Sequence, residues 1–335
     1  MKVSSFHALL VAATSLIAHA SADFTVTPEA IIRASTSKHV KFVKQWTLSA
    51  GTTTNTIDSI DLSLAGNAYV SYVSGLPNDI LGYVNVSGDS RAVVNAVTVS
   101  KDVVNDLDLD LFDDDNNVGG ELNVWVNNKA ASGYLLTEIF LADTEAVTDV
   151  KSQYSAQVVI EDGVLVTEDK KVELQIEATG SSSVYVSAPD TTVKVQKLSL
   201  ETTGTASIEY NVDSVSATSA LQIDAEGASS VTVLSSTLST SKLELGAASS
   251  GSICIAADQV KARWRDIQGK SKISMPNAVK KHGTTGTFTC EESTLPERKA
   301  AQIEAAPTGM GSSLFDDDDS LDSDNDSDLD DFTEN

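Results

Sequence analysis

Apolar and polar residues alternate in short paired segments that recur along the second half of the chain. Each unit has an apolar pair, a turn, and a second apolar pair that begins eight positions after the first pair ends. The units start at Leu174, Leu198, Leu221 and Leu243, so they repeat after 24, 23 and 22 residues. Alternation with a period of two is typical of β-strands that bury one face. The pattern therefore predicts two short strands per unit.

A single unit of this kind is too thin to bury its own apolar residues. Successive units that stack with equivalent strands ~4.8 Å apart share a narrow core, and they pair every backbone group except at the two ends. We therefore predict an all-β fold, a β-helix or solenoid with one coil per 22 to 24 residues. A β-sandwich with hairpins at a similar spacing is the alternative.

The first half of the chain carries a less regular version of the pattern. The apolar pairs at Leu62 and Val84 are again 22 residues apart. No linker separates the halves, so we expect one solenoid over residues 23–290, with two lobes (23–150 and 151–290) as the alternative. Residues 291–335 lack periodicity and end in aspartate and serine. Such a segment buries too little apolar surface to offset its ordering entropy, so we expect a disordered acidic tail.

The N-terminal residues predict export from the cell. Lys2, the apolar run from Leu9 to Ile17, and the small residues Ala20-Ser21-Ala22 match the three regions of a signal peptide, which we place at residues 1–22. The apolar run is shorter than the ~20 residues of a transmembrane helix. We therefore expect a secreted protein, extracellular or at the cell surface, without membrane insertion.

Export changes what the cysteines and one asparagine predict. Cys254 and Cys290 are the two cysteines of the chain, and in an oxidising compartment an even pair is expected to form one disulfide. Asn85 begins an Asn-Val-Ser sequon, as Asn325 begins Asn-Asp-Ser. We take Asn85 as the candidate glycosylation site.

The repeats also resemble a known family. An L-x-[LI] strand, a turn with glycine and a [VI]-x-[VY] strand, recurring behind a signal peptide, resemble the head GIN domain family of auto-transporter adhesins. The segments that carry the likeness are residues 62–72, 83–93 and 174–255. The resemblance implies a β-helix-like stack in a secreted, adhesin-like protein.

Charge and histidine content limit the chemistry. The formal net charge of −25 opposes general affinity for nucleic acid, which needs a cationic face. Outside the signal peptide only His39 and His282 remain; neither lies in a nucleophile-elbow or cysteine-protease context, and we expect both on the surface. We therefore expect no enzyme and no cofactor. A weak Ca²⁺ site is a candidate in the acidic turn. Its residues are Asp113, Asp114, Asp115 and Asn117.

One basic cluster interrupts the acidic background after the last repeat. It consists of Lys261, Arg263, Trp264, Arg265, Lys270, Lys272, Lys280 and Lys281. Its charges either are solvated on a cap of the solenoid or recognise an anionic partner such as an acidic polysaccharide. In the second case the acidic tail, residues 316–331, is expected to fold back on the cluster as a competitor.

These observations favour a non-catalytic function. We expect a structural or adhesion-like protein that binds an extracellular glycan or a surface protein, and the alternative is a polysaccharide-acting β-helix enzyme. A flat face lined by hydroxyls would favour binding. Three or more carboxylates on one face of adjacent coils would favour the enzyme.

Overall fold

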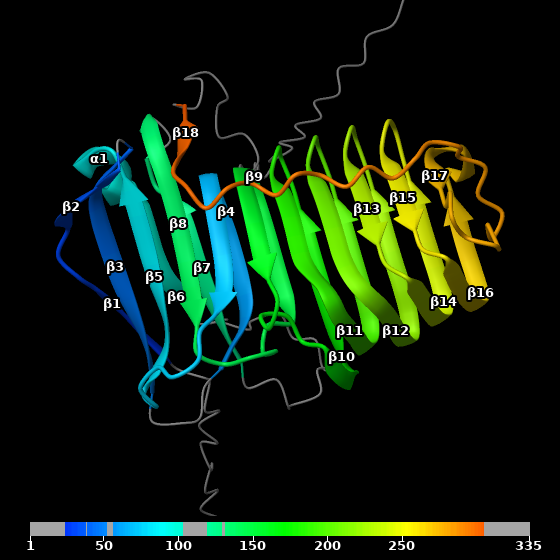
Figure 1. Cartoon of the computed structure of the whole chain (residues 1–335), viewed down its shortest axis with the longest axis horizontal. Coiled ribbons are helices and arrows are strands. Elements are labelled where there is room, and N and C mark those ends of the chain that lie inside the picture. The colour runs from blue at the N-terminus through cyan, green and yellow to red at the C-terminus, as the bar shows by residue number, and fades with distance from the viewer. Residues whose placement is uncertain (1–23, 38, 52–55, 103–118, 129–130, 305–335) are drawn as a thin grey trace, which may run out of the picture.

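A computed structural model describes residues 24–304 apart from 38, 52–55, 103–118 and 129–130. The described chain is nearly all β and forms a β-solenoid of about five turns, with coils of about 24 residues (Figure 1). The predicted all-β solenoid is thus confirmed, and the alternative β-sandwich is not what forms. The expected signal peptide, the candidate Ca²⁺ turn and the acidic tail from residue 305 lie outside the described residues.

The second half of the chain builds regular, parallel coils. Its strands are β9 (Asp149–Glu161), β10 (Glu168–Ala178), β11 (Ser183–Thr202), β12 (Ser207–Ala225), β13 (Ser230–Leu234), β14 (Thr237–Ala247), β15 (Ser252–Ala256), β16 (Gln259–Gln268) and β17 (Ile273–Ser274), with a 3₁₀ turn, η1, at Lys270–Lys272. Leu198 pairs in register with Leu221, and Leu221 with Leu243, as the repeat predicted. Each coil therefore places equivalent residues directly above one another.

Each regular coil has three straight segments and hence three outer faces. We name the faces by what covers or lines them. The carboxylate face comprises residues 197–202, 220–225 and their equivalents; the strap face comprises 183–188, 207–212 and theirs; the hydroxyl face comprises 192–195, 214–217 and theirs. Breaks in the ladder register, between Ala188 and Thr192 and between Val195 and Lys197, mark two corners of β11.

The core is a stack of the inward apolar residues. Leu174, Leu198, Leu221 and Leu243 form one such column, and all four are at most 1% exposed. Burying a leucine side chain stabilises the fold by ~2 kcal/mol. The next position of the column is Arg265, paired with Leu243 and exposed at the end of the stack. The change from leucine to arginine ends the apolar column, and with it the solenoid.

The first half joins this stack in an order that the sequence spacing did not predict. Its elements are β1 (Phe24–Pro28), β2 (Ile32–Ser37), β3 (Val40–Ala50), β4 (Thr56–Tyr72), β5 (Ile80–Gly88), α1 (Arg91–Asn95), β6 (Val97–Asp102), β7 (Gly119–Val126) and β8 (Gly133–Leu141). Strand β4 lies between β9 and the pair β7 and β8, all parallel to it, with Ile60 beside Val150. The hydrogen-bonded ladder therefore continues unbroken from the first half into the second.

The expectation that Leu62 and Val84 occupy equivalent positions of successive coils is wrong. Leu62 lies in β4, which pairs with β7, β8 and β9, whereas Val84 lies in β5. Strand β5 runs antiparallel to both β3 and β8, with Val84 opposite Ile139.

Beyond Cys290 the chain crosses back over the coils as an extended segment, which we call the strap (residues 291–304). Figure 1 shows it running along the solenoid from β17 past β15 and β13 to β18 (Ala301–Ile303). Strand β18 pairs antiparallel with β8. The sequence-based boundary of the disordered tail at residue 291 is therefore corrected, since the chain is held against the solenoid as far as Glu304.

The strap lacks periodicity because it runs across the strands and meets a different side chain on each coil. The Ser293 N–H donates to Glu209 Oε2 at 2.9 Å, and the Tyr69 hydroxyl donates to the carbonyl of Pro296 at 2.5 Å. Arg298 then anchors the far end: its guanidinium donates to Glu161 Oε1 at 2.6 Å and lies 4.7 Å from the Tyr69 ring centroid. Side-chain hydrogen bonds and a charge-assisted pair thus replace the regular ladder.

Tyr210 tests whether a buried hydroxyl without a hydrogen bond destabilises the core. Its side chain is fully buried, its hydroxyl has no hydrogen-bond partner among the described residues, and burial raises the pKa of that hydroxyl above its ordinary range. An unsatisfied buried hydroxyl costs ~1–3 kcal/mol, so Tyr210→Phe is expected to leave the free energy of unfolding unchanged or to raise it by ~1 kcal/mol. Urea unfolding measures this, with the more exposed Tyr72→Phe as control. A loss above ~1 kcal/mol would contradict the expectation.

Candidate functional site

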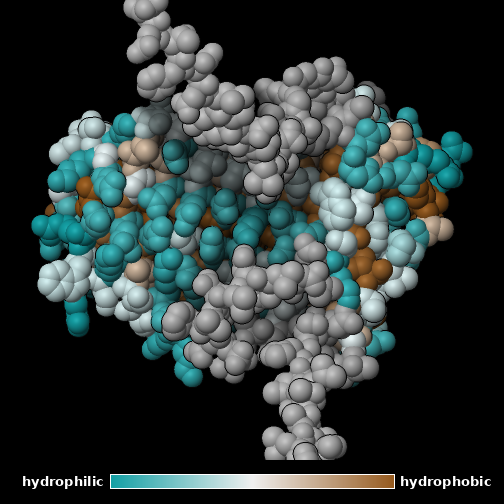
Figure 2. All heavy atoms as spheres, turned by 180° about the vertical axis from the view of Figure 1, so that it is seen from behind, coloured by the Kyte–Doolittle hydropathy of each residue, from teal (hydrophilic) through white to brown (hydrophobic). Residues whose placement is uncertain are grey.

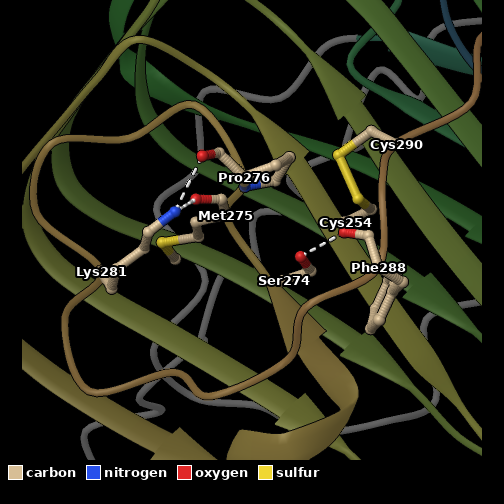
Figure 3. The surroundings of a disulfide bond; sticks show 7 residues. All are labelled: Cys254, Ser274, Met275, Pro276, Lys281, Phe288 and Cys290. Carbon is tan, nitrogen blue, oxygen red and sulfur yellow. Dashed lines mark hydrogen bonds between the residues drawn. A yellow bond between two sulfur atoms is a disulfide. The ribbon is translucent and has the colours of Figure 1, made fainter.

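The C-terminal end of the solenoid is closed by a stapled loop. Cys254 and Cys290 form the predicted disulfide, with their Cα atoms 5.4 Å apart (Figure 3). Cys254 lies on the strap face, so the bond fixes the start of the strap to β15. The Ser274 hydroxyl adds a hydrogen bond of 2.5 Å to the carbonyl of Phe288. The loop between β17 and Cys290 is thereby held over the last coil.

Three of the predicted basic residues converge at this end. Lys261 and Arg263 of β16 and Lys280 of the loop line one pocket of about 390 Å³, which we call the cationic pocket. Its remaining lining residues are Ser239, Thr240, Val260 and Ala262. Within the described part of the chain, none of the three cations forms an ion pair. They create a local positive potential on an acidic protein.

The rest of the basic cluster is used differently. The Lys281 ammonium donates to the carbonyls of Met275 and Pro276, and Figure 3 shows it turned toward both. The Lys272 ammonium likewise donates to the carbonyl of Ser249. These two lysines hold the cap together, so their charges are already engaged.

The remaining members of the cluster are exposed around the pocket. Trp264 is 74% exposed beside Arg263, and Lys270 and Arg265 are exposed at the last turn. The eight residues predicted as one patch therefore divide into three that line the pocket, two that bind carbonyls of the cap, and three that are exposed around it.

His282 contradicts the expectation of a surface histidine. It is only 5% exposed, and its Nε2 lies 2.9 Å from the carbonyl oxygen of Val260. The cap loop covers the last coil and carries His282 beneath it, which no local pattern signals. His39, the other histidine, stacks on the ring of Tyr134 at 3.7 Å between ring centroids.

The hydroxyl face leads directly into the cationic pocket. One outward column on it comprises Lys194, Ser216, Ser239 and Lys261, and a second comprises Thr192, Ser214, Thr237 and Gln259. Ser239 and Lys261 belong both to the first column and to the pocket wall. The hydroxyls of Ser216 and Ser239 form no hydrogen bond with any described residue. They are free to bind a ligand.

Sequence reasoning missed a row of carboxylates. Glu177, Glu201 and Asp224 occupy equivalent outward positions of three consecutive coils on the carboxylate face. Ser199 Oγ donates to Glu201 at 2.8 Å, and Gln222 Nε2 donates to Asp224 at 2.9 Å. The signal was present, since each acid directly follows the first apolar pair of its repeat. Such a cluster was set as the mark of an enzyme, but its members, which are 24 and 23 residues apart, were not identified from the sequence.

In the first half of the chain this row continues through Lys151 to Asp61, and Asp58 lies three residues before Asp61 on the same strand. Burial is the main cause that raises the pKa of the Asp58 carboxyl to about 6; a hydrogen bond to its own backbone lowers it, and the negative charges of Asp149 and Glu121 raise it. Burial also raises the pKa of Asp61 nearby. Gly119 makes room for Asp58, because a Cβ there would lie 1.5 Å from Asp58 Oδ2. The Asp58 carboxyl therefore stays protonated up to a higher pH than an ordinary aspartate.

Asp58 makes the stability of the protein depend on pH. The folded pKa of about 6 lies above the ordinary carboxyl value of 3.8, so the folded protein holds the proton more tightly than the unfolded chain. This contribution is present below pH 4 and is lost as the pH rises through 6. Asp58→Asn is therefore expected to reduce the loss of stability between pH 4 and pH 7, measured by urea unfolding. The exposed Asp79→Asn is the control, and an equal effect of both variants would contradict the assignment.

The other candidate sites have the following positions. Asn85 is half-buried in the middle of β5, between Gln45 of β3 and Glu138 of β8, and its glycosylation stays a prediction. The Asp113–Asn117 turn lies outside the described residues. In the ranges that are described, no three His, Cys, Asp or Glu side chains are grouped to hold a metal ion, and no helix is long and apolar enough to cross a membrane.

No protein-family model matches the chain, and no match to it is found among the curated proteins.

Proposed function

We propose that the chain is a secreted, non-catalytic, adhesion-like protein that binds an anionic extracellular glycan or surface protein at its C-terminal end. The observation that carries the proposal is the cationic pocket. Lys261, Arg263 and Lys280 come from two elements and meet without a carboxylate partner in the described structure, on a chain of net charge −25. An anionic ligand supplies the missing counter-charge.

Protection of a sheet edge accounts for only part of this arrangement. Strand β16 pairs with β14 alone along the carboxylate and hydroxyl faces, and charged residues on an exposed edge discourage pairing with other chains. Lys261 and Arg263 suffice for that role. Edge protection does not require Lys280, on a separate loop, to close the same pocket.

Three further observations support the extracellular, adhesion-like part of the proposal. The Cys254–Cys290 disulfide suits an oxidising compartment. The stacked repeats suit the resemblance to the head GIN domain family, whose members are adhesin-like. The acidic tail, residues 316–331, has the charge to compete with an anionic ligand for the cationic pocket. Deleting this tail is then expected to strengthen retention on an anionic resin.

The carboxylate face favours a second candidate, a polysaccharide-acting β-helix enzyme. Glycoside hydrolysis needs one carboxyl that donates a proton and another that is ionised. Asp58, with its raised pKa, and Asp149, whose charge contributes to that shift, are the residues that fit these roles. With Glu177, Glu201 and Asp224 in register on the same face, the structure has the three carboxylates on adjacent coils that sequence reasoning set as the mark of an enzyme.

One experiment separates the two candidates. Purified protein, residues 23–335, is applied to a glycan array with and without Ca²⁺, and every bound glycan is examined for cleavage. Uncleaved binding of anionic glycans that is lost in Lys261→Glu and kept in Lys171→Glu, a matched charge change at an exposed site of β10, supports the binding protein. Cleavage that is lost in Asp58→Asn supports the enzyme. Silence on all glycans contradicts the enzyme and the glycan-binding form of the proposal, and leaves a surface protein as the partner.

A further inference from the structure

We infer that the cationic pocket and the hydroxyl face form one site for a linear acidic polysaccharide that lies along the solenoid axis. This inference rests on the proposed function and specifies its ligand. The pocket supplies charge at one end, and the coils behind it supply a row of hydroxyls.

The two parts are physically continuous. Ser239 and Lys261 line the pocket, and they are also consecutive members of the column that continues through Ser216 to Lys194. A polymer with one group bound by Lys261 in the pocket therefore extends along the same column, where it contacts Ser239 and then Ser216. The second column, with Thr237 and Ser214, runs beside it at the same spacing.

The spacing of the columns suits a polymer of sugars. Equivalent residues in neighbouring coils are ~4.8 Å apart, and a pyranose residue in an extended chain advances by a similar length. Each sugar then meets one coil and one or two hydroxyls. A compact anion uses the pocket only, whereas a polysaccharide gains a further set of hydrogen bonds with every sugar that reaches the next coil.

Charge sets the far limit of the site. Lys194, at the last position of the first column, is paired with Glu168 at 2.5 Å, and the Thr191 hydroxyl donates to Asp162 at 2.6 Å. These carboxylates oppose an anionic chain, so productive contacts end there. From Lys261 to Lys194, both included, the column contains four residues, one from each coil. The site therefore accommodates about four sugars, one per coil.

Orientation follows from the charges on either side of the columns. Asp213 and Asp258 lie at the corners where two of the coils enter the hydroxyl face, next to the Thr192–Gln259 column. Arg263 lies past the other end of the short strands, next to Lys261. The acidic groups of the polysaccharide are thus directed toward Arg263, and its neutral hydroxyls toward Ser214 and Thr237.

The test is a size series of two acidic oligosaccharides, oligogalacturonates and heparin-derived oligosaccharides, titrated by calorimetry into the protein, residues 23–335. For at least one series the affinity is expected to rise about tenfold or more from the monosaccharide or disaccharide to the tetrasaccharide, and then to level off. Ser216→Glu is expected to abolish this gain while leaving the binding of the shortest ligand unchanged. Ser230→Glu, the same change at a half-buried outward serine of the strap face, is expected to keep the gain.

The contrary outcomes are distinct. Equal affinity for all lengths, or a length gain that survives in Ser216→Glu, overturns the inference and leaves an anion-binding pocket. No binding in either series overturns the inference, and the glycan array then decides whether the proposed function fails with it. Retention on phosphatidylserine–phosphatidylcholine vesicles that needs the exposed Trp264 and Val279, without oligosaccharide binding, also overturns it by showing a membrane surface as the partner.

Discussion

Gly204→Ala is expected to lower the free energy of unfolding by ~3 kcal/mol. Gly204 has a φ of +78°, where a side chain costs ~1–2 kcal/mol. A Cβ there would also lie 2.7 Å from the carbonyl oxygen of Gly180 in the preceding coil. That oxygen belongs to the backbone of the stack and cannot move aside alone, which adds an overpacking cost of ~1–3 kcal/mol. Urea unfolding measures the sum.

Gly75→Ala is the matched control for this variant. Gly75 has a φ of +82°, but a Cβ there would meet nothing within 4 Å. It therefore bears the conformational cost without the contact, and a loss of ~1–2 kcal/mol is expected. The difference between the two variants isolates the close stacking of the turns. Equal losses would show that the turns of successive coils do not constrain one another.

The same stacking explains why the second half of the chain could be predicted from the sequence. Gly180, Gly204 and Gly227 follow their apolar pairs at a constant distance, and equivalent residues of neighbouring coils pair in register. The coils differ in length at the corners between the faces, where the register breaks, and not at the glycine turns. The period was therefore sufficient to predict coil length and the inward residues of two segments per coil. The third segment, on the hydroxyl face, was not predicted, because its residues lie outside the repeated apolar pairs.

The first half could not be predicted in this way, because its strands pair out of sequence order. Ile60 lies beside Val150, and the contact is visible neither as a repeat nor as a hairpin turn. The strap is a second example. Tyr69 and Arg298 come from opposite ends of the chain, yet the Arg298 guanidinium lies 4.7 Å from the centroid of the Tyr69 ring. This contact depends on the whole stack between them.

The candidate site was predicted in part. Charge density alone identified Lys261, Arg263 and Lys280, but it also included Lys281 and Lys272, whose ammonium groups turn inward to backbone carbonyls. Sequence proximity cannot separate these two uses of lysine, since the difference depends on where the cap loop folds. Conversely, the carboxylates of the carboxylate face escaped notice because they are a whole coil apart in sequence and adjacent only in space.

Removal of the disulfide in Cys254→Ala/Cys290→Ala is expected to lower the free energy of unfolding by ~4 kcal/mol. The two cysteines are 36 residues apart, and the cross-link restricts the unfolded chain by an amount that grows with this separation. The cost is expected to fall mainly on the cap and on the start of the strap, because the coils from β9 to β14 form their ladders without it. Hydrogen exchange measures this distribution along the chain.

Arg298→Ala tests the opposite end of the strap. Its guanidinium donates to Glu161 and to Ser71 Oγ at 2.8 Å, so its loss is expected to speed exchange in β18 while the cap around Cys254 stays protected. The double alanine variant is expected to show the reverse order, with the cap affected first. If both variants speed exchange equally over the whole strap, the segment is released as one unit and its two anchors depend on each other. If neither changes exchange in β18, its pairing with β8 is the contact that holds the strap in place.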